Sequence, residues 1–229
     1  MVSSVNAGPK STAARAATPA SGVSGVPLAE RAYIALRDMI VTLQLRPGSP
    51  LEEAIGAQLG IGRTPLREAI KRLEAESLVV IYPRRGTFVA EVNLTDHSLI
   101  SDVRRQLEGH AAHRAAERAT DEDRQRLRDL ARTVREHAGG REQGMRLDTL
   151  IHREVYRCAH NRYLEANLSQ YYNLSLRIWY LFLDRLPEVD HAAEHLPMID
   201  AIIAGQSDVA LEYAVRHVSH FEQSVHDAL

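Results

Sequence analysis

The sequence predicts a mainly α-helical protein in two parts: three short helices with a small β-hairpin, followed by an antiparallel all-α helical bundle. Three observations lead to this prediction. Apolar residues recur at helical spacing over most of the chain from Leu28 onward. Short β-branched runs replace that pattern between residues 79 and 89, and turn residues divide the remainder into segments of helix length. We expect one domain over residues 28–92 and a second over residues 95–229.

The first part contains three helical segments. The first is expected from Leu28 to Leu43, ahead of a Pro-Gly pair. A second, short helix fits residues 52–59. The third is expected over residues 64–76, with the Thr64 hydroxyl as its N-cap and Pro65 at its first helical position, where a missing N–H costs little.

The next residues predict a hairpin and then longer helices. Val79-Val80-Ile81 and Thr87-Phe88-Val89 alternate in the manner of strands and are separated by a five-residue turn segment. Since no internal repeat is visible, the helices that follow fit a bundle better than a solenoid. Their expected ranges are 96–119, 122–138, 145–160, 162–184, 191–204 and 208–229.

The composition of the 229 residues, with 45% hydrophobic and 25% charged, is that of a chain able to bury one or two compact cores. No apolar run approaches the ~20 residues that a membrane-spanning helix needs, and no secretory signal opens the chain. We therefore expect a cytoplasmic protein with no membrane partner. Residues 1–27, which are rich in Ser, Ala, Gly and Pro, are expected to form a disordered tail.

Three short helices followed by a hairpin form the outline of a winged helix-turn-helix, with the hairpin as the wing. Arg63, Arg67 and Lys71 repeat every four residues along one face of the third helix, a position suited to phosphates and guanine edges. Arg84 and Arg85 add charge at the hairpin tip. From the charge pattern alone, an ordinary solvated helix face is an equally good explanation.

The stretch LRPGSPLEEAIGAQLGIGRTPLREAIKRLEAESLVVIYPRRGTFVA resembles the DNA-binding domain of GntR-type bacterial transcription regulators, most specifically in GRTPLREAI. The resemblance implies that Arg63, Thr64 and Arg67 contact operator double-stranded DNA. It also implies further contacts from the wing, whose tip is formed by Arg84, Arg85 and Gly86. Two residues depart from the family pattern: Glu53 stands where many members carry an arginine, and Ser77 replaces the glycine that usually ends the recognition helix.

Histidines and carboxylates are the candidate metal ligands, because the single cysteine, Cys158, cannot build a cysteine-rich site. Asp148 and His152 lie four residues apart and share one helix face, although an exposed Asp/His pair is the commoner outcome of that spacing. His195 and His217 lie at nearly equal distances from the turn at Gly205, so their imidazoles can meet in an antiparallel hairpin. The pair formed by His191 and His220 fits that geometry nearly as well.

The segments LDTLIHREVYRCAHNRYL and EHLPMIDAIIAGQSDVALEYAVRHV are similar to the FCD ligand-binding domain of the FadR-like branch of the GntR family. This resemblance implies a divalent metal held by Asp148, His152, His195 and His217. Three imidazoles and one carboxylate suit Zn²⁺, with Ni²⁺ and Mn²⁺ as alternatives.

The segment VRRQLEGHAA resembles the first helix of the same domain and implies that Arg104 faces the effector-binding cavity. An arginine there is a natural partner for a carboxylate effector. The alternative is a helix-surface arginine bonded to Glu108. Asn161 is expected to cap the helix that follows it, and Trp179 is expected to lie in the core or the pocket wall.

Together these resemblances imply a ligand-responsive, homodimeric, DNA-binding transcription regulator and not an enzyme. A metal-dependent hydrolase is the rival interpretation, but the sequence offers no separate general base at a suitable spacing. A metal sensor, in which the ion itself is the signal, is the third.

Overall fold

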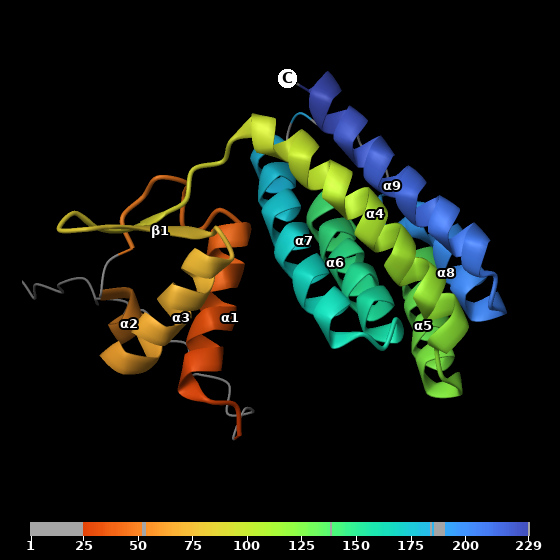
Figure 1. Cartoon of the computed structure of the whole chain (residues 1–229), viewed down its shortest axis with the longest axis horizontal. Helices are drawn as coiled ribbons and strands as arrows, with labels where there is room; N and C mark the ends of the chain where they lie inside the picture. The colour runs from red at the N-terminus through yellow and green to blue at the C-terminus, as the bar shows by residue number, and fades with distance from the viewer. Residues whose placement is uncertain (1–24, 52–53, 138, 184, 186–190, 229) are drawn as a thin grey trace, which may run out of the picture.

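The computed structural model describes residues 25–51, 54–137, 139–183, 185 and 191–228. Figure 1 shows a small N-terminal part beside a bundle of long helices. The predicted mainly α-helical fold, with a β-hairpin after the third helix and an all-α bundle, is confirmed. The expected disordered tail lies outside the described residues, apart from its last three.

The N-terminal part is a winged helix-turn-helix with one hydrophobic core. Its elements are α1 (Leu28–Val41), α2 (Ala54–Gln58), α3 (Arg63–Ala75), β1 (Val79–Tyr82) and β2 (Gly86–Val89). The strands are antiparallel, with Val79 opposite Val89. Leu36, Leu73 and Leu78 are fully buried between the helices and the hairpin.

The start of α3 differs from the prediction. The helix begins at Arg63, its N-cap is Gly62 in an extended conformation, and no side chain caps it. The expected capping role of Thr64 is therefore wrong. Pro65 still lies in the first turn, where a helix leaves its backbone N–H groups without intrahelical partners.

The bundle is built around one long central helix. Its elements are α4 (Leu94–Arg118), α5 (Asp121–Arg135), α6 (Arg141–Cys158), α7 (Arg162–Phe182), the 3₁₀-helix η1 (Ala193–His195), α8 (Leu196–Ala204) and α9 (Ser207–Asp227). α4 packs against α6, α7, α8 and α9. No helix of the described part is long and apolar enough to cross a membrane.

Two helix starts in the bundle differ from the prediction by more than two residues. α6 begins four residues early because Gly140 is its N-cap, while its first buried apolar residue, Met145, lies a turn later. The helix expected from His191 begins as the 3₁₀ turn η1 and becomes α-helical at Leu196. The expected cap at Asn161 is confirmed, since its side chain accepts hydrogen bonds from the backbone of Tyr163 and Leu164.

The two parts are in direct contact. Val41, the last residue of α1, is buried in a core cluster of the bundle. Conversely, Leu174 of α7 packs against the N-terminal core. Arg177 of α7 also donates a hydrogen bond from Nη2 to the carbonyl oxygen of Ala90, at 2.6 Å. The segment between β2 and α4 is thus held by the bundle.

Asp123 joins α5 to the turn between α6 and α7. It forms a capping box with Thr120, and its carboxylate accepts hydrogen bonds from Arg157 at 2.8 Å and from His160 at 2.7 Å. Burial alone raises the pKa of Asp123, but the hydrogen bonds from Thr120, His160 and Arg157 more than offset this and hold the pKa well below its usual range.

Asp123→Asn is expected to lower the stability of the fold at pH 7, because the amide cannot reproduce these charge-assisted hydrogen bonds. A depressed pKa gives stability that is present above the unfolded pKa, about 3.9, and is lost as the pH falls through the folded pKa. The stability difference between the variant and the native protein should therefore shrink below about pH 4. Urea unfolding at a series of pH values measures it, and a pH-independent difference contradicts the assignment.

Candidate metal centre and DNA-binding surface

The four predicted metal ligands come together inside the bundle. Asp148 and His152 lie on α6, His195 ends η1 and His217 lies on α9, and all four are buried. One possible ligand atom from each lies within 4.8 Å of the others. The rings of His195 and His217 have centroids 3.9 Å apart.

The turn at Gly205 explains how two distant histidines meet. Gly205 has φ 73° and joins α8 to α9, a left-handed conformation that glycine adopts without steric cost. The two arms then run back antiparallel, so His195 and His217 reach the same level. The alternative pair is not part of this cluster: His191 packs edge-on against Trp179, and His220 is exposed.

The inner nitrogen atoms of the three histidines point to one carboxylate. The Nε2 atoms of His195, His152 and His217 lie 2.7, 3.7 and 4.0 Å from oxygens of Asp148. The buried Nε2 of His152 has no hydrogen-bond partner among the described residues. A buried nitrogen without a partner is costly unless something binds it, and one carboxylate with three imidazoles is a donor set that fits a divalent cation.

Carboxylates also face the outer nitrogens of two of these rings. The Nδ1 atom of His152 lies 3.1 Å from Glu108 Oε2, and that of His217 lies 3.4 Å from Glu194 Oε2. The carboxylate at the outer nitrogen of His152 favours a proton on its Nδ1, which leaves the Nε2 lone pair directed at the centre.

Sequence reasoning missed several of these supporting residues. The sequence suggests Glu108 only as a partner of Arg104, and no spacing signal marks Glu194, although it precedes His195 directly. Tyr172, whose hydroxyl donates to Asp148 at 2.7 Å, comes from α7, and its position in the sequence has no regular spacing to the four candidate ligands.

The electrostatics of the centre give the protonation states that metal binding requires. Burial raises the pKa of Asp148, but His152, His195 and His217 more than offset it and hold the pKa well below its usual range. Burial, with the neighbouring His195 and His152, lowers the pKa of His217 to about 4. At neutral pH the centre therefore contains a carboxylate beside a neutral imidazole.

Arg104 lies next to this centre and is buried. Its Nε donates to Glu108 Oε1 at 2.6 Å, so the alternative partner is present, but the pair is inside the bundle and not on a helix surface. Arg104 also lines a cavity with Asp148, His152 and His217. The cavity volume is about 10 Å³, which is room for about one water-sized group.

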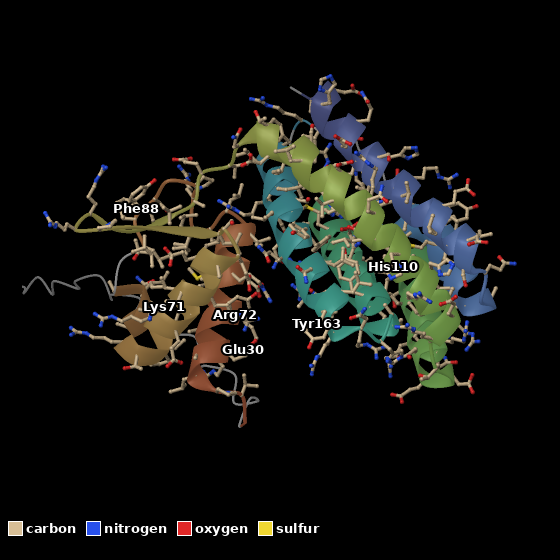
Figure 2. All side chains as sticks on the ribbon, viewed as in Figure 1. Glu30, Lys71, Arg72, Phe88, His110 and Tyr163 are labelled. Carbon is tan, nitrogen blue, oxygen red and sulfur yellow. The ribbon has the colours of Figure 1, made fainter. Side chains whose placement is uncertain are left out.

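The predicted DNA-contacting residues of α3 are exposed. Arg63, Thr64, Arg67 and Lys71 all lie at the surface, while Leu66, Ala69 and Leu73 of the same helix are buried in the N-terminal core. In Figure 2, Lys71 lies on the side of α3 away from the bundle and Arg72 on the side facing it. Arg72 is engaged there with Glu30 at 2.7 Å.

The wing presents a second exposed basic surface. Arg84 and Arg85 are exposed at the hairpin tip, where Arg84 and Gly86 have φ values of 63° and 106°. Glu53 lies outside the described residues. Ser77 has φ 62°, so the position after α3 does require the left-handed conformation that a glycine adopts freely and a serine adopts at some cost.

An exposed basic helix and wing on one domain, joined to a second domain with a buried centre, define a two-domain regulatory protein. Residues 28–89 match the family described as "Bacterial regulatory proteins, gntR family", and residues 99–220 match the FCD domain. The chain therefore belongs to the GntR family of bacterial transcription regulators, with an FCD domain, and not to a class of enzymes.

Individual relatives agree with this assignment. The "Probable D-xylose utilization operon transcriptional repressor" of Paenarthrobacter nicotinovorans is 30% identical over 197 residues, which are 81% of this chain and 85% of that protein. A regulator of Streptomyces ambofaciens is 44% identical over 62 residues, but this match spans only 26% of that relative. The solved structure of E. coli McbR/YncC has the same fold, with a TM-score of 0.77 at 20% identity over 88% of this chain and 98% of that one.

Proposed function

We propose that this protein is a ligand-responsive regulator that binds operator DNA through α3 and the wing, and that binds a divalent metal and a small carboxylate effector in its FCD domain. The observation that carries the proposal is the buried cluster of Asp148 and three histidines beside the buried Arg104. The protein acts as a homodimer in the cytoplasm, because two winged helices are needed to bind the two halves of a palindromic operator.

Operator contacts are assigned to Arg63, Thr64, Arg67 and Lys71 of α3, and to Arg84, Arg85 and Gly86 of the wing. Support comes from their exposure on one helix face and one hairpin tip. A recognition helix places side chains against base edges in the major groove, whereas a basic wing tip suits the phosphate backbone.

Arg63→Ala and Arg67→Ala are each expected to weaken binding to operator DNA selected from a random pool by ~1 to 3 kcal/mol per lost bidentate base contact. Gel-shift titration at fixed salt measures this. Arg84→Ala and Arg85→Ala should instead weaken specific and random DNA equally and flatten the salt dependence. Arg132→Ala, exposed on α5, serves as the control with unchanged affinity. Native affinity in both α3 variants would remove α3 from the interface.

The metal is assigned to Asp148, His152, His195 and His217, with Zn²⁺ as the first candidate and Ni²⁺ or Mn²⁺ as alternatives. A bound ion would act as a Lewis acid that binds a carboxylate oxygen. Arg104 adds a positive charge on the cavity wall. Because the cavity admits only about one water-sized group, an effector must displace wall residues such as Trp179 and Phe221. That displacement gives ligand binding a route to a change in the bundle.

Calorimetric titration of citrate and of acetate, which lack an apolar body, tests this assignment. We expect binding to the metal-loaded protein, much weaker binding to the metal-free protein, and an altered affinity for the protein–operator complex. The last effect must be reciprocal, with a factor commonly of about 5 to 150. Equal binding of citrate and acetate to all three forms contradicts both the metal-anchored site and the coupling to DNA.

A further inference from the structure

A second pocket lies where the two domains meet, away from the metal centre. Its volume is about 330 Å³, within the range of small-molecule sites. Ser77 at the end of α3 and the segment 91–93 form one side, and α4 and α7 form the other. Most of its wall is apolar, from Leu99, Ile100, Val103, Leu174 and Ile178. No residue that lines this pocket lines the cavity beside the metal ligands.

One buried cation lines this apolar pocket. Arg177 is 2% exposed. Its Nη2 donates to the carbonyl oxygen of Ala90, but its Nε is buried and has no hydrogen-bond partner among the residues that the structure describes. Among the described residues, Arg177 forms no salt bridge, and the carboxylate that acts on its charge is that of Glu91. A buried charge without a counter-ion is costly.

The surroundings of Arg177 do not neutralise this charge. Burial lowers the pKa of Arg177 to about 10, even though Glu91 acts in the opposite direction. Glu91 and Asp96, the two carboxylates that line the pocket, are exposed to solvent, and their attraction is therefore screened by water and salt.

We propose that this pocket binds a small organic anion with an apolar body, whose acidic oxygens bond the guanidinium of Arg177 while the body packs between α4 and α7. This site is independent of the proposed metal-anchored effector site. A ligand here contacts both the end of the recognition helix and the bundle, because Ser77 and Arg177 come from different domains. Its binding restricts the placement of the DNA-binding domain relative to the FCD domain.

Calorimetry with 1-naphthoate on the full chain tests the proposal, with uncharged 1-naphthamide as the matched probe. We expect one naphthoate site per chain and at least about tenfold weaker binding of the amide, the usual weight of a charge-assisted hydrogen bond. Arg177→Met should lower the affinity by a similar factor. Binding should persist in His195→Ala, which separates this pocket from the metal centre.

A second pair of variants does not disturb the buried arginine. Ser77→Asp adds a carboxylate to the wall at a position whose φ of 62° aspartate and asparagine tolerate well. It should weaken naphthoate binding about tenfold. Ser77→Asn introduces an uncharged side chain of the same shape as aspartate, and its affinity for naphthoate should stay within about threefold of the native value. Equal binding of naphthoate and naphthamide, equal affinities of the two Ser77 variants, or loss of binding in His195→Ala would each overturn the proposal.

Discussion

His195→Ala and His217→Ala are each expected to release most of the metal, from about one divalent ion per chain in the native protein. Each change removes one of four converging ligands in a buried site, and no spare histidine of the cluster can replace it. Elemental analysis after dialysis measures the content. The metal-dependent gain in stability, ~2.7 kcal/mol when the free ion is at 100 times its Kd, should be lost in the same variants.

His191→Ala and His220→Ala are the matched controls, because these histidines belong to the same hairpin but lie outside the cluster. Both are expected to keep the ion. Circular dichroism establishes that all four variants retain their helices. If the controls lose the metal while His195→Ala and His217→Ala keep it, the ligand assignment is wrong. The ion is then held by His191 and His220.

Glu108→Ala is expected to destabilise the metal-free protein by roughly 3 to 5 kcal/mol, the usual cost of leaving one member of a buried ion pair alone. Arg104 and Glu108 are 3% and 4% exposed, and the guanidinium of Arg104 contacts Glu108 Oε1 at 2.5 Å. The same substitution removes the carboxylate partner of His152 Nδ1 and leaves the Tyr156 hydroxyl as its other partner, which should lower metal affinity about 10- to 100-fold. Unfolding in guanidinium chloride, with and without metal, separates the loss of stability from the loss of metal affinity.

The double variant Arg104→Met/Glu108→Leu distinguishes unpaired charge from lost packing. Replacing a whole buried ion pair with apolar side chains is often neutral or stabilising, so the double variant should recover most of the stability lost in Glu108→Ala. Its response to a carboxylate effector should be lost, because Arg104 is gone. A double variant as unstable as the single one would mean that the charge of Arg104 is not the cause.

The sequence predicted those features that depend on local periodicity. Helix and strand types followed from the spacing of apolar residues. The position of Gly205 and the rise of an α-helix showed that His195 and His217 could meet, and the resemblance to the FCD domain selected this pair. The spacing alone also allowed the pair of His191 and His220. The distance of a residue from the turn does not determine whether its side chain points into the bundle.

The remaining errors have physical causes. The cap of α3 is set by the extended backbone of Gly62 and not by a side chain, which composition does not reveal. The first turn of α6 carries no buried apolar residue, so the apolar pattern in the sequence begins only at Met145. Tyr172 reaches Asp148 from another helix, a contact that only the packing of α6 against α7 creates.

The contact of Val41 with the bundle core and the bond from Arg177 to Ala90 have a consequence for the choice of operator. A DNA-binding domain on a loose tether tolerates many separations between half-sites, because the chain between the domains absorbs the difference. A domain fixed at its hinge does not. In the proposed homodimer, two such domains reach both half-sites only when these lie on the same face of the DNA. The spacing between half-sites must therefore match the helical repeat of about 10 to 10.5 base pairs per turn. Two correct half-sites on opposite faces of the DNA are then not an operator.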